Sequence, residues 1–114
     1  MRSSASRRKR IFSFAEAATL LPEVRRLTQG AVQRLEELGA RFTEEGQLAD
    51  DRREVHGVVT TWAETVQELG LEVKGLWLVD FDNGSGYYCW RYPEESLQFY
   101  HSYEEGFRGR MRIQ

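Results

Sequence analysis

Cysteine, histidine and long apolar runs are all scarce in this chain of 114 residues. A single cysteine excludes an internal disulfide and any zinc site built from several cysteines. No apolar run approaches the roughly 18 residues of a membrane-spanning helix, so we expect no membrane span. Of the two histidines, only His101 lies in the aromatic-rich last third, where Cys89 also lies. That third is where a specific site is expected.

Acidic residues are absent from the first ten positions, which carry five of the 16 basic groups. The rest of the chain holds 11 basic and 18 acidic residues, so a basic arm precedes an acidic domain. The arm lacks the apolar segment and cleavage site of a secretory signal, and we expect a cytoplasmic protein. Length and composition predict a disordered basic tail over 1–10 and a single domain over 11–114.

A capping box marks the start of the helical half. Ser13 and Glu16 are three residues apart, a spacing at which each side chain reaches the other's backbone amide. This pattern predicts a short N-terminal helix over Ala15–Leu20. Pro22 should break or kink it, because proline has no amide hydrogen and disfavours helical geometry in the preceding residue.

Two longer helices are expected after Pro22. Apolar residues recur every three or four positions from 24 to 42, and again over a helix from 48 to 69. Gly70 should cap the second helix in a left-handed conformation. Because the turn over 43–46 is short, the two helices should form an antiparallel hairpin.

The period changes to that of β-strands after Gly70. Segments rich in aromatic and branched residues, separated by turn residues, predict strands over Leu76–Phe81, Tyr87–Tyr92 and Leu97–Ser102. The expected fold class is therefore α+β: a long antiparallel helical hairpin packed on a three-stranded antiparallel meander, with the short N-terminal helix beside it.

Turn lengths predict the register of these strands. Tyr88 should lie opposite Asp80 on one side and His101 on the other, which separates Asp80 from His101 by roughly 10 Å. A metal, water or ligand would have to bridge that gap. The opposite face is also largely apolar. It needs cover from the short helix, the C-terminal segment or a second subunit, which favours a homo-oligomer.

The candidate site is a group of polar residues at the rim of the sheet. His101 with Asp80, Glu94 and Glu104 offers imidazole and carboxylate ligands for a metal, although the spacing matches no dedicated metal motif. His101 also suits general acid–base catalysis, but no nucleophile with an adjacent base is evident, which favours a non-enzymatic role. Cys89 is interpreted as a small buried apolar residue.

Three arginines near the C-terminus offer a different chemistry. Arg91, Arg108 and Arg110 can bind a small ligand with the acidic rim, or nucleic acid through phosphates and base stacking. The acidic domain around them argues against nucleic acid. Pairing with nearby glutamates, within the chain or across an oligomer interface, is the favoured alternative.

Several motifs resemble an uncharacterised bacterial family, domain of unknown function 2203. They are carried by residues 12–17, 20–24, 78–81, 89–91, 100–101 and 106–110. The resemblance covers about 11–110 and implies no activity or cofactor. The chain departs from the family pattern at Pro93-Glu94, where a Gly-Glu pair is usual. It departs again at Tyr100-His101-Ser102, where Trp-His-Glu is usual.

Three functions follow as hypotheses. The first is a non-enzymatic binding or assembly module that self-associates through its aromatic sheet and arginine-rich end. The second is a metal- or small-ligand-binding protein with a site around His101, in which Tyr88 also takes part. The third is nucleic-acid binding through the C-terminal arginines. The candidate site residues are Asp80, Arg91, Glu94, His101, Glu104, Arg108 and Arg110.

Overall fold

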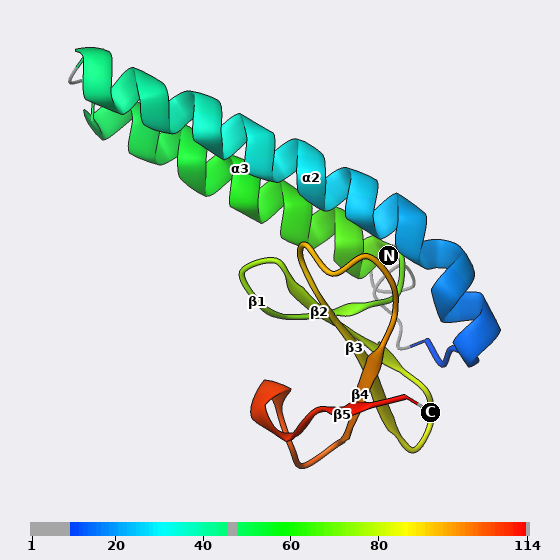
Figure 1. Cartoon of the computed structure of the whole chain (residues 1–114). Coiled ribbons are helices and arrows are strands. Elements are labelled where there is room, and N and C mark those ends of the chain that lie inside the picture. Colours follow the sequence, from blue (N-terminus) through cyan, green and yellow to red (C-terminus); the bar gives the residue numbers. More distant parts are fainter. Residues whose placement is uncertain (1–9, 46–47, 114) are drawn as a thin grey trace, which may run out of the picture.

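The computed structural model describes residues 10–45 and 48–113. Figure 1 shows two long helices that form an antiparallel hairpin, with a sheet packed against one end of it. This arrangement confirms the α+β class. The elements in chain order are α2 (Phe14–Glu45), α3 (Leu48–Glu68), β1 (Glu72–Gly75), β2 (Leu78–Asp82), β3 (Gly86–Arg91), β4 (Phe99–Ser102), the 3-10 helix η1 (Phe107–Gly109) and β5 (Met111–Arg112).

Most of the predicted basic tail, 1–9, and Gly46 of the predicted turn lie outside the described residues. Arg10 is described. Its guanidinium donates to the carbonyl oxygen of Leu69 at 3.2 Å and lies 4.2 Å from the centre of the Phe12 ring. Arg10 thus contacts the end of α3, although the prediction placed it in the tail. No helix among the described residues is long and apolar enough to cross a membrane.

The capping box is present, but the short N-terminal helix is not a separate element. The Glu16 amide donates to Ser13 Oγ at 3.1 Å, and the Ser13 amide donates to Glu16 Oε1 at 2.9 Å. The helix α2 that starts here continues through Pro22 to Glu45, so of the two predicted effects of Pro22, a break or a kink, the break does not occur. Ala17, Leu21 and Val24 share one buried face across Pro22, and their burial outweighs the one hydrogen bond that proline removes.

The hairpin is joined by a buried polar contact. Trp62 Nε1 of α3 donates to Thr28 Oγ1 of α2 at 2.8 Å, and Thr28 Oγ1 donates to the Val24 carbonyl at 2.8 Å. Each polar atom in this chain of bonds has a partner, so Thr28 is fully buried without an unsatisfied group. Gly70 follows α3 with φ of +100°, which confirms the predicted left-handed cap.

The sheet has five antiparallel strands in the order β1-β2-β3-β4-β5, not the three that were predicted. The two additional strands are short edge strands: β1 has four residues and β5 has two. Their sequences, Glu-Val-Lys-Gly and Met-Arg, carry little strand signal. Leu76 was assigned to a strand but precedes the turn at Trp77, whose φ is +61°.

The register also differs from the prediction by one residue on both sides of β3. Asp80 pairs with Cys89 and Phe81 with Tyr88, while β4 places Phe99 opposite Cys89 and His101 opposite Tyr87. The predicted four-residue turn after Tyr92 does not form, because residues 92–98 make a longer connection between β3 and β4. A shift of one residue exchanges the two faces of a strand, so β3 turns Cys89 rather than Tyr88 towards the face of Asp80 and His101.

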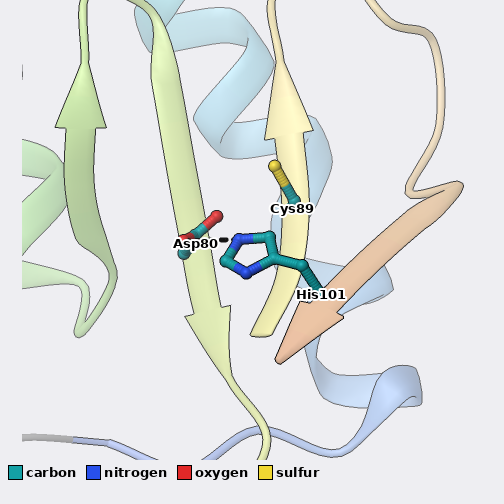
Figure 2. Close-up of side chains that lie close together, drawn as sticks. All are labelled: Asp80, Cys89 and His101. Carbon is teal, nitrogen blue, oxygen red and sulfur yellow. Dashed lines mark hydrogen bonds and ion pairs between the residues drawn. The ribbon is translucent and has the colours of Figure 1, made fainter. Parts of the chain in front are cut away.

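The two faces of the sheet therefore have distinct roles. Val79, Phe81 and Trp90 point towards the helices and belong to the main core, together with Trp62 and Val66 of α3. The face with Asp80, Cys89 and His101 points away from α2, which lies behind the sheet in Figure 2. The C-terminal segment, one of the three covers that were expected, borders this second face with Phe107 of η1.

Candidate metal site

Three adjacent strands bring Asp80, Cys89 and His101 together on the second face of the sheet (Figure 2). One potential ligand atom from each residue lies within 4.8 Å of the others. All three are buried, with relative exposures of 1%, 1% and 3%. The predicted gap between Asp80 and His101 is wrong, because their side chains meet at 3.0 Å over the small Cys89. The prediction used the backbone separation across two strands and left out the length of the two side chains.

The hydrogen bonds of His101 define what its second nitrogen can do. Nδ1 lies 2.8 Å from the carbonyl oxygen of Ser102, which can only accept, so Nδ1 carries a hydrogen. In a neutral ring Nε2 then has a lone pair, and it faces Asp80 Oδ2 at 3.0 Å. Two acceptors at this distance need a proton or a metal cation between them. A backbone carbonyl on the remote nitrogen is also the usual second-shell partner of a metal-binding histidine.

Asp80 has one carboxylate oxygen that is not satisfied. Oδ1 is buried and has no hydrogen-bond partner among the described residues. Burial raises the pKa of Asp80 above its ordinary value, while the nearby His101 and the Cys89 thiol lower it by less. A buried carboxylate oxygen without a donor is expensive in free energy, and a bound cation removes that penalty.

Cys89 is poorly suited to act as a free nucleophile. Burial and the neighbouring Asp80 raise the pKa of its thiol to about 12, although Arg110 partly opposes this. A thiol is a weak nucleophile until it is deprotonated, and both ring nitrogens of His101 already have other partners. A metal ion changes this condition, because a thiol that coordinates a metal is deprotonated and its proton is released to solvent.

The spacing of the three donor atoms fits a small metal ion after a modest contraction. Bonds of about 2.0–2.3 Å to oxygen, nitrogen and sulfur in a tetrahedron put ligand atoms about 3.3–3.7 Å apart. The observed donors lie between 3.0 and 4.8 Å from one another, so shifts of about 1 Å complete the geometry. Sulfur with imidazole and carboxylate is a ligand set typical of Zn²⁺ and its neighbours, and three protein ligands leave a fourth position open.

The open side of the cluster faces a pocket of about 400 Å³. Aromatic rings of Tyr87, Tyr103 and Phe107 form part of its wall, and Lys74, Glu104 and Glu105 lie around it. The pocket has room for several water molecules or a small organic ligand beyond a metal ion. A metal here would therefore have access to solvent or to a ligand through its fourth position.

The other predicted site residues do not join this cluster directly. Glu94 pairs with Arg110, with 2.8 Å between Oε2 and Nη2, and also accepts from the Arg91 amide at 2.9 Å. Arg110 stacks on the rings of Phe99 and Phe107, with 3.9 and 4.1 Å from Cζ to the ring centres. This second group supports the C-terminal segment. It meets the first where Arg110 Nη1 lies 3.9 Å from Cys89 Sγ and where Phe99 pairs with Cys89 between β4 and β3.

The remaining predicted residues lie at the surface. Glu104 is exposed at the pocket, Arg108 is exposed in η1, and Arg91 is exposed with its guanidinium 5.4 Å from the Phe107 ring centre. The Arg110 guanidinium contacts Glu94 and two aromatic rings, whereas Arg91 and Arg108 are exposed. The three arginines therefore differ in how far their charges are available to a partner. The hypothesis of nucleic-acid binding through them stays a prediction.

Cys89 is the site residue that sequence reasoning missed. The prediction treated it as a buried apolar residue, and it is buried, but on the polar face with Asp80 and His101. Tyr88, which was expected there, lies instead on the helix-facing side and contacts Phe14. Alternation along β3 alone could not decide between them, because aromatic residues occupy both faces of this strand.

A family model described as "Uncharacterized conserved protein (DUF2203)" matches residues 10–113. No curated protein and no solved structure matches the chain. The match covers the helical hairpin, the sheet and all three residues of the candidate metal site.

Proposed function

Because the chain belongs to the DUF2203 family, whose description names no activity, we propose its function from the site itself: it binds a divalent metal ion of the zinc class. Asp80, Cys89 and His101 are the protein ligands, and the fourth position opens to the pocket. This proposal refines the predicted site around His101. Asp80 and His101 remain ligands, and Cys89 replaces Glu94 and Glu104.

One observation carries the proposal. One carboxylate oxygen of Asp80, one ring nitrogen of His101 and the Cys89 sulfur lie within 4.8 Å of one another at a buried point, where one cation can bind all three residues. A shared proton can satisfy only the contact between Asp80 and His101. It leaves the remaining carboxylate oxygen with no donor stronger than the protonated Cys89 thiol, which makes a purely structural role the poorer account of the group.

Metal titration of untagged protein tests this proposal. After treatment with a chelator and dialysis, Zn²⁺ should bind with one ion per chain in calorimetry. Co²⁺ should give the visible bands of a tetrahedral site and a charge-transfer band from the thiolate. Cys89→Ser should abolish that charge-transfer band. Asp80→Asn and His101→Gln should each weaken Zn²⁺ binding by more than the roughly 10–100-fold of second-shell changes.

The chain offers a matched control in its other histidine. His56 is exposed on α3, where it lies 3.4 Å from Thr60 Oγ1, and His56→Gln should leave metal binding unchanged. Circular dichroism of each variant reports whether the fold is retained. Absence of stoichiometric binding by folded wild-type protein would overturn the metal proposal and leave Asp80 and His101 as a structural pair.

We also propose that the protein self-associates. The surface that supports this proposal lies on the helical hairpin and not on the aromatic sheet. An apolar groove of about 370 Å³ runs between α2 and α3, and nothing lies within 4 Å of the Cβ positions of Gly30 or Gly57. A second copy is the expected occupant, because two such hairpins related by a two-fold axis complete a four-helix bundle. The groove is lined by Leu27, Ala31, Gly57, Val58, Thr61, Trp62 and Thr65.

A further inference from the structure

We infer that the pocket above the metal site takes a small amine, and that it selects against anions. This inference rests on the metal proposal, because the amine nitrogen fills the fourth coordination position. The ligand class is a short aliphatic diamine or a similar compound. One amino group releases its proton to solvent and binds the metal as a neutral nitrogen, and the second, protonated amino group lies among the aromatic rings and carboxylates of the pocket.

The charge around the pocket is predominantly negative. Glu104 and Glu105 line it with exposed carboxylates, and Asp80 lies at its base. Lys74 is the cation among the lining residues, and its Nζ pairs with Glu72 Oε1 at 2.9 Å. The metal centre adds no net charge, since Asp80 and the Cys89 thiolate balance a divalent ion. A cationic group is therefore favoured at the mouth, and an anion is repelled.

The tyrosine hydroxyls in the wall do not point their hydrogens at a pocket ligand. Tyr87 Oη donates to both carboxylate oxygens of Glu72, at 3.1 and 3.2 Å. Tyr103 Oη donates to Asp82 Oδ1 at 2.7 Å. An anionic ligand would need such donors, whereas a protonated amine needs acceptors and ring faces.

The aromatic rings in the pocket wall form an environment that attracts cations. Tyr87 and Tyr103 meet edge to face with their centres 5.1 Å apart, and Phe107 lies in the same pocket wall. A phenol that donates to a carboxylate has a more electron-rich ring, which strengthens its attraction for a cation. Cations of the fold already lie on two of these rings, Lys74 Nζ at 4.8 Å from the Tyr87 ring centre and the Arg110 guanidinium at 4.1 Å from that of Phe107, so the rings of this wall attract cationic groups.

Three compounds of equal chain length and different charge test the inference on the cobalt-loaded protein. These are 1,4-diaminobutane, 1,4-butanediol and succinate, each titrated while the visible bands of Co²⁺ are followed. The diamine should change the bands at a concentration about tenfold lower than either of the other two, consistent with a cation held against aromatic rings. Equal or tighter binding of succinate, or no response to the diamine, overturns the inference.

Removal of the two carboxylates at the mouth provides a second measurement. The double variant Glu104→Gln/Glu105→Gln should weaken diamine binding by about fivefold, the size expected for exposed ion pairs. The matched control is Glu36→Gln/Glu37→Gln, an adjacent exposed pair on α2, which should leave it unchanged. If cobalt bands never form, the metal proposal and this inference both fall. If they form without a preference for the diamine, only this inference is overturned.

Discussion

The burial of Cys89 was predicted correctly, but its place in the candidate metal site was missed. A lone cysteine between aromatic residues of a strand is expected to be buried, and it is 1% exposed. Its neighbours decide its chemistry. Burial raises the pKa of its thiol, Asp80 opposite it on β2 raises that pKa further, and Arg110 opposes both effects. The same residue one position further along the strand would have packed against the helices.

The thiol should be unreactive in the metal-free folded protein. With a pKa of about 12 instead of its ordinary 9.0, its thiolate fraction at pH 8 falls about 1000-fold. We expect alkylation by iodoacetamide to be slower by at least that factor in native protein than in protein unfolded by urea, as followed by mass spectrometry. Similar rates in the two states would show that the thiol is neither buried nor shifted.

Residue types also predicted which side chains share a site, but only in part. Asp80 and His101 were expected on one face because the predicted register placed both beside Tyr88. That shared face is confirmed. Their direct contact was not predictable, because it depends on the side chain between them being as small as that of Cys89. Glu94 was separated from them by its ion pair with Arg110.

Helix α2 shows the same limit at the scale of an element. Local rules place a helix start at Ser13 and a break or kink at Pro22; the start is confirmed, and the helix is not broken. Capping is a local interaction of the backbone and two side chains, so the sequence contains all of it. The break depends on whether burial on both sides of proline outweighs one lost hydrogen bond, and that burial comes from other elements.

Replacement of Pro22 should therefore stabilise the protein. Pro22 is exposed, so Pro22→Ala restores an amide hydrogen in mid-helix without loss of packing. The free energy of unfolding should rise by about 1–3 kcal/mol, because proline costs roughly 3 kcal/mol in a helix interior. Urea denaturation followed by circular dichroism measures this.

The control for Pro22 is Thr19→Ala at an exposed position of the same helix. It should change the free energy of unfolding by no more than about 0.7 kcal/mol, the span of ordinary helix propensities. A Pro22→Ala variant no more stable than wild type would mean that α2 is broken at Pro22 in solution.

The strands were located to within about two residues where they are long and aromatic, and missed where they are short. The edges β1 and β5 carry too few residues for a period of two to be recognised. Register was the weaker inference, because it depended on an assumed turn after Tyr92. The connection over 92–98 is instead shaped by local bonds, such as Trp90 Nε1 to the Glu94 carbonyl at 2.8 Å.

The whole molecule is elongated, with extents of 48 × 37 × 25 Å, because the hairpin projects beyond the sheet (Figure 1). Within residues 10–45 and 48–113 no third layer covers the open side of the two-helix arm, and an apolar groove lies along it. Proteins that leave such a surface in water commonly bury it against another subunit. This is the physical basis for the proposed self-association.

Sedimentation velocity over a wide concentration range tests that proposal. Wild-type protein should show a sedimentation coefficient that rises with concentration towards that of a dimer. Val58→Glu, which puts a charge in the groove, should remain monomeric at every concentration. Thr19→Glu, an exposed control on α2 outside the groove, should behave as wild type. A wild-type protein that stays monomeric throughout would contradict the proposal.

The sequence by itself determined the local features: the capping box, two long amphipathic helices, the left-handed Gly70 and the approximate position of three strands. These follow from interactions among residues close in the chain. The tertiary structure decided that α2 continues through Pro22, which face of β3 carries Cys89, and that Asp80, Cys89 and His101 meet. These depend on burial and strand register, which arise only when distant segments pack together, and a register shift of one residue suffices to change the site.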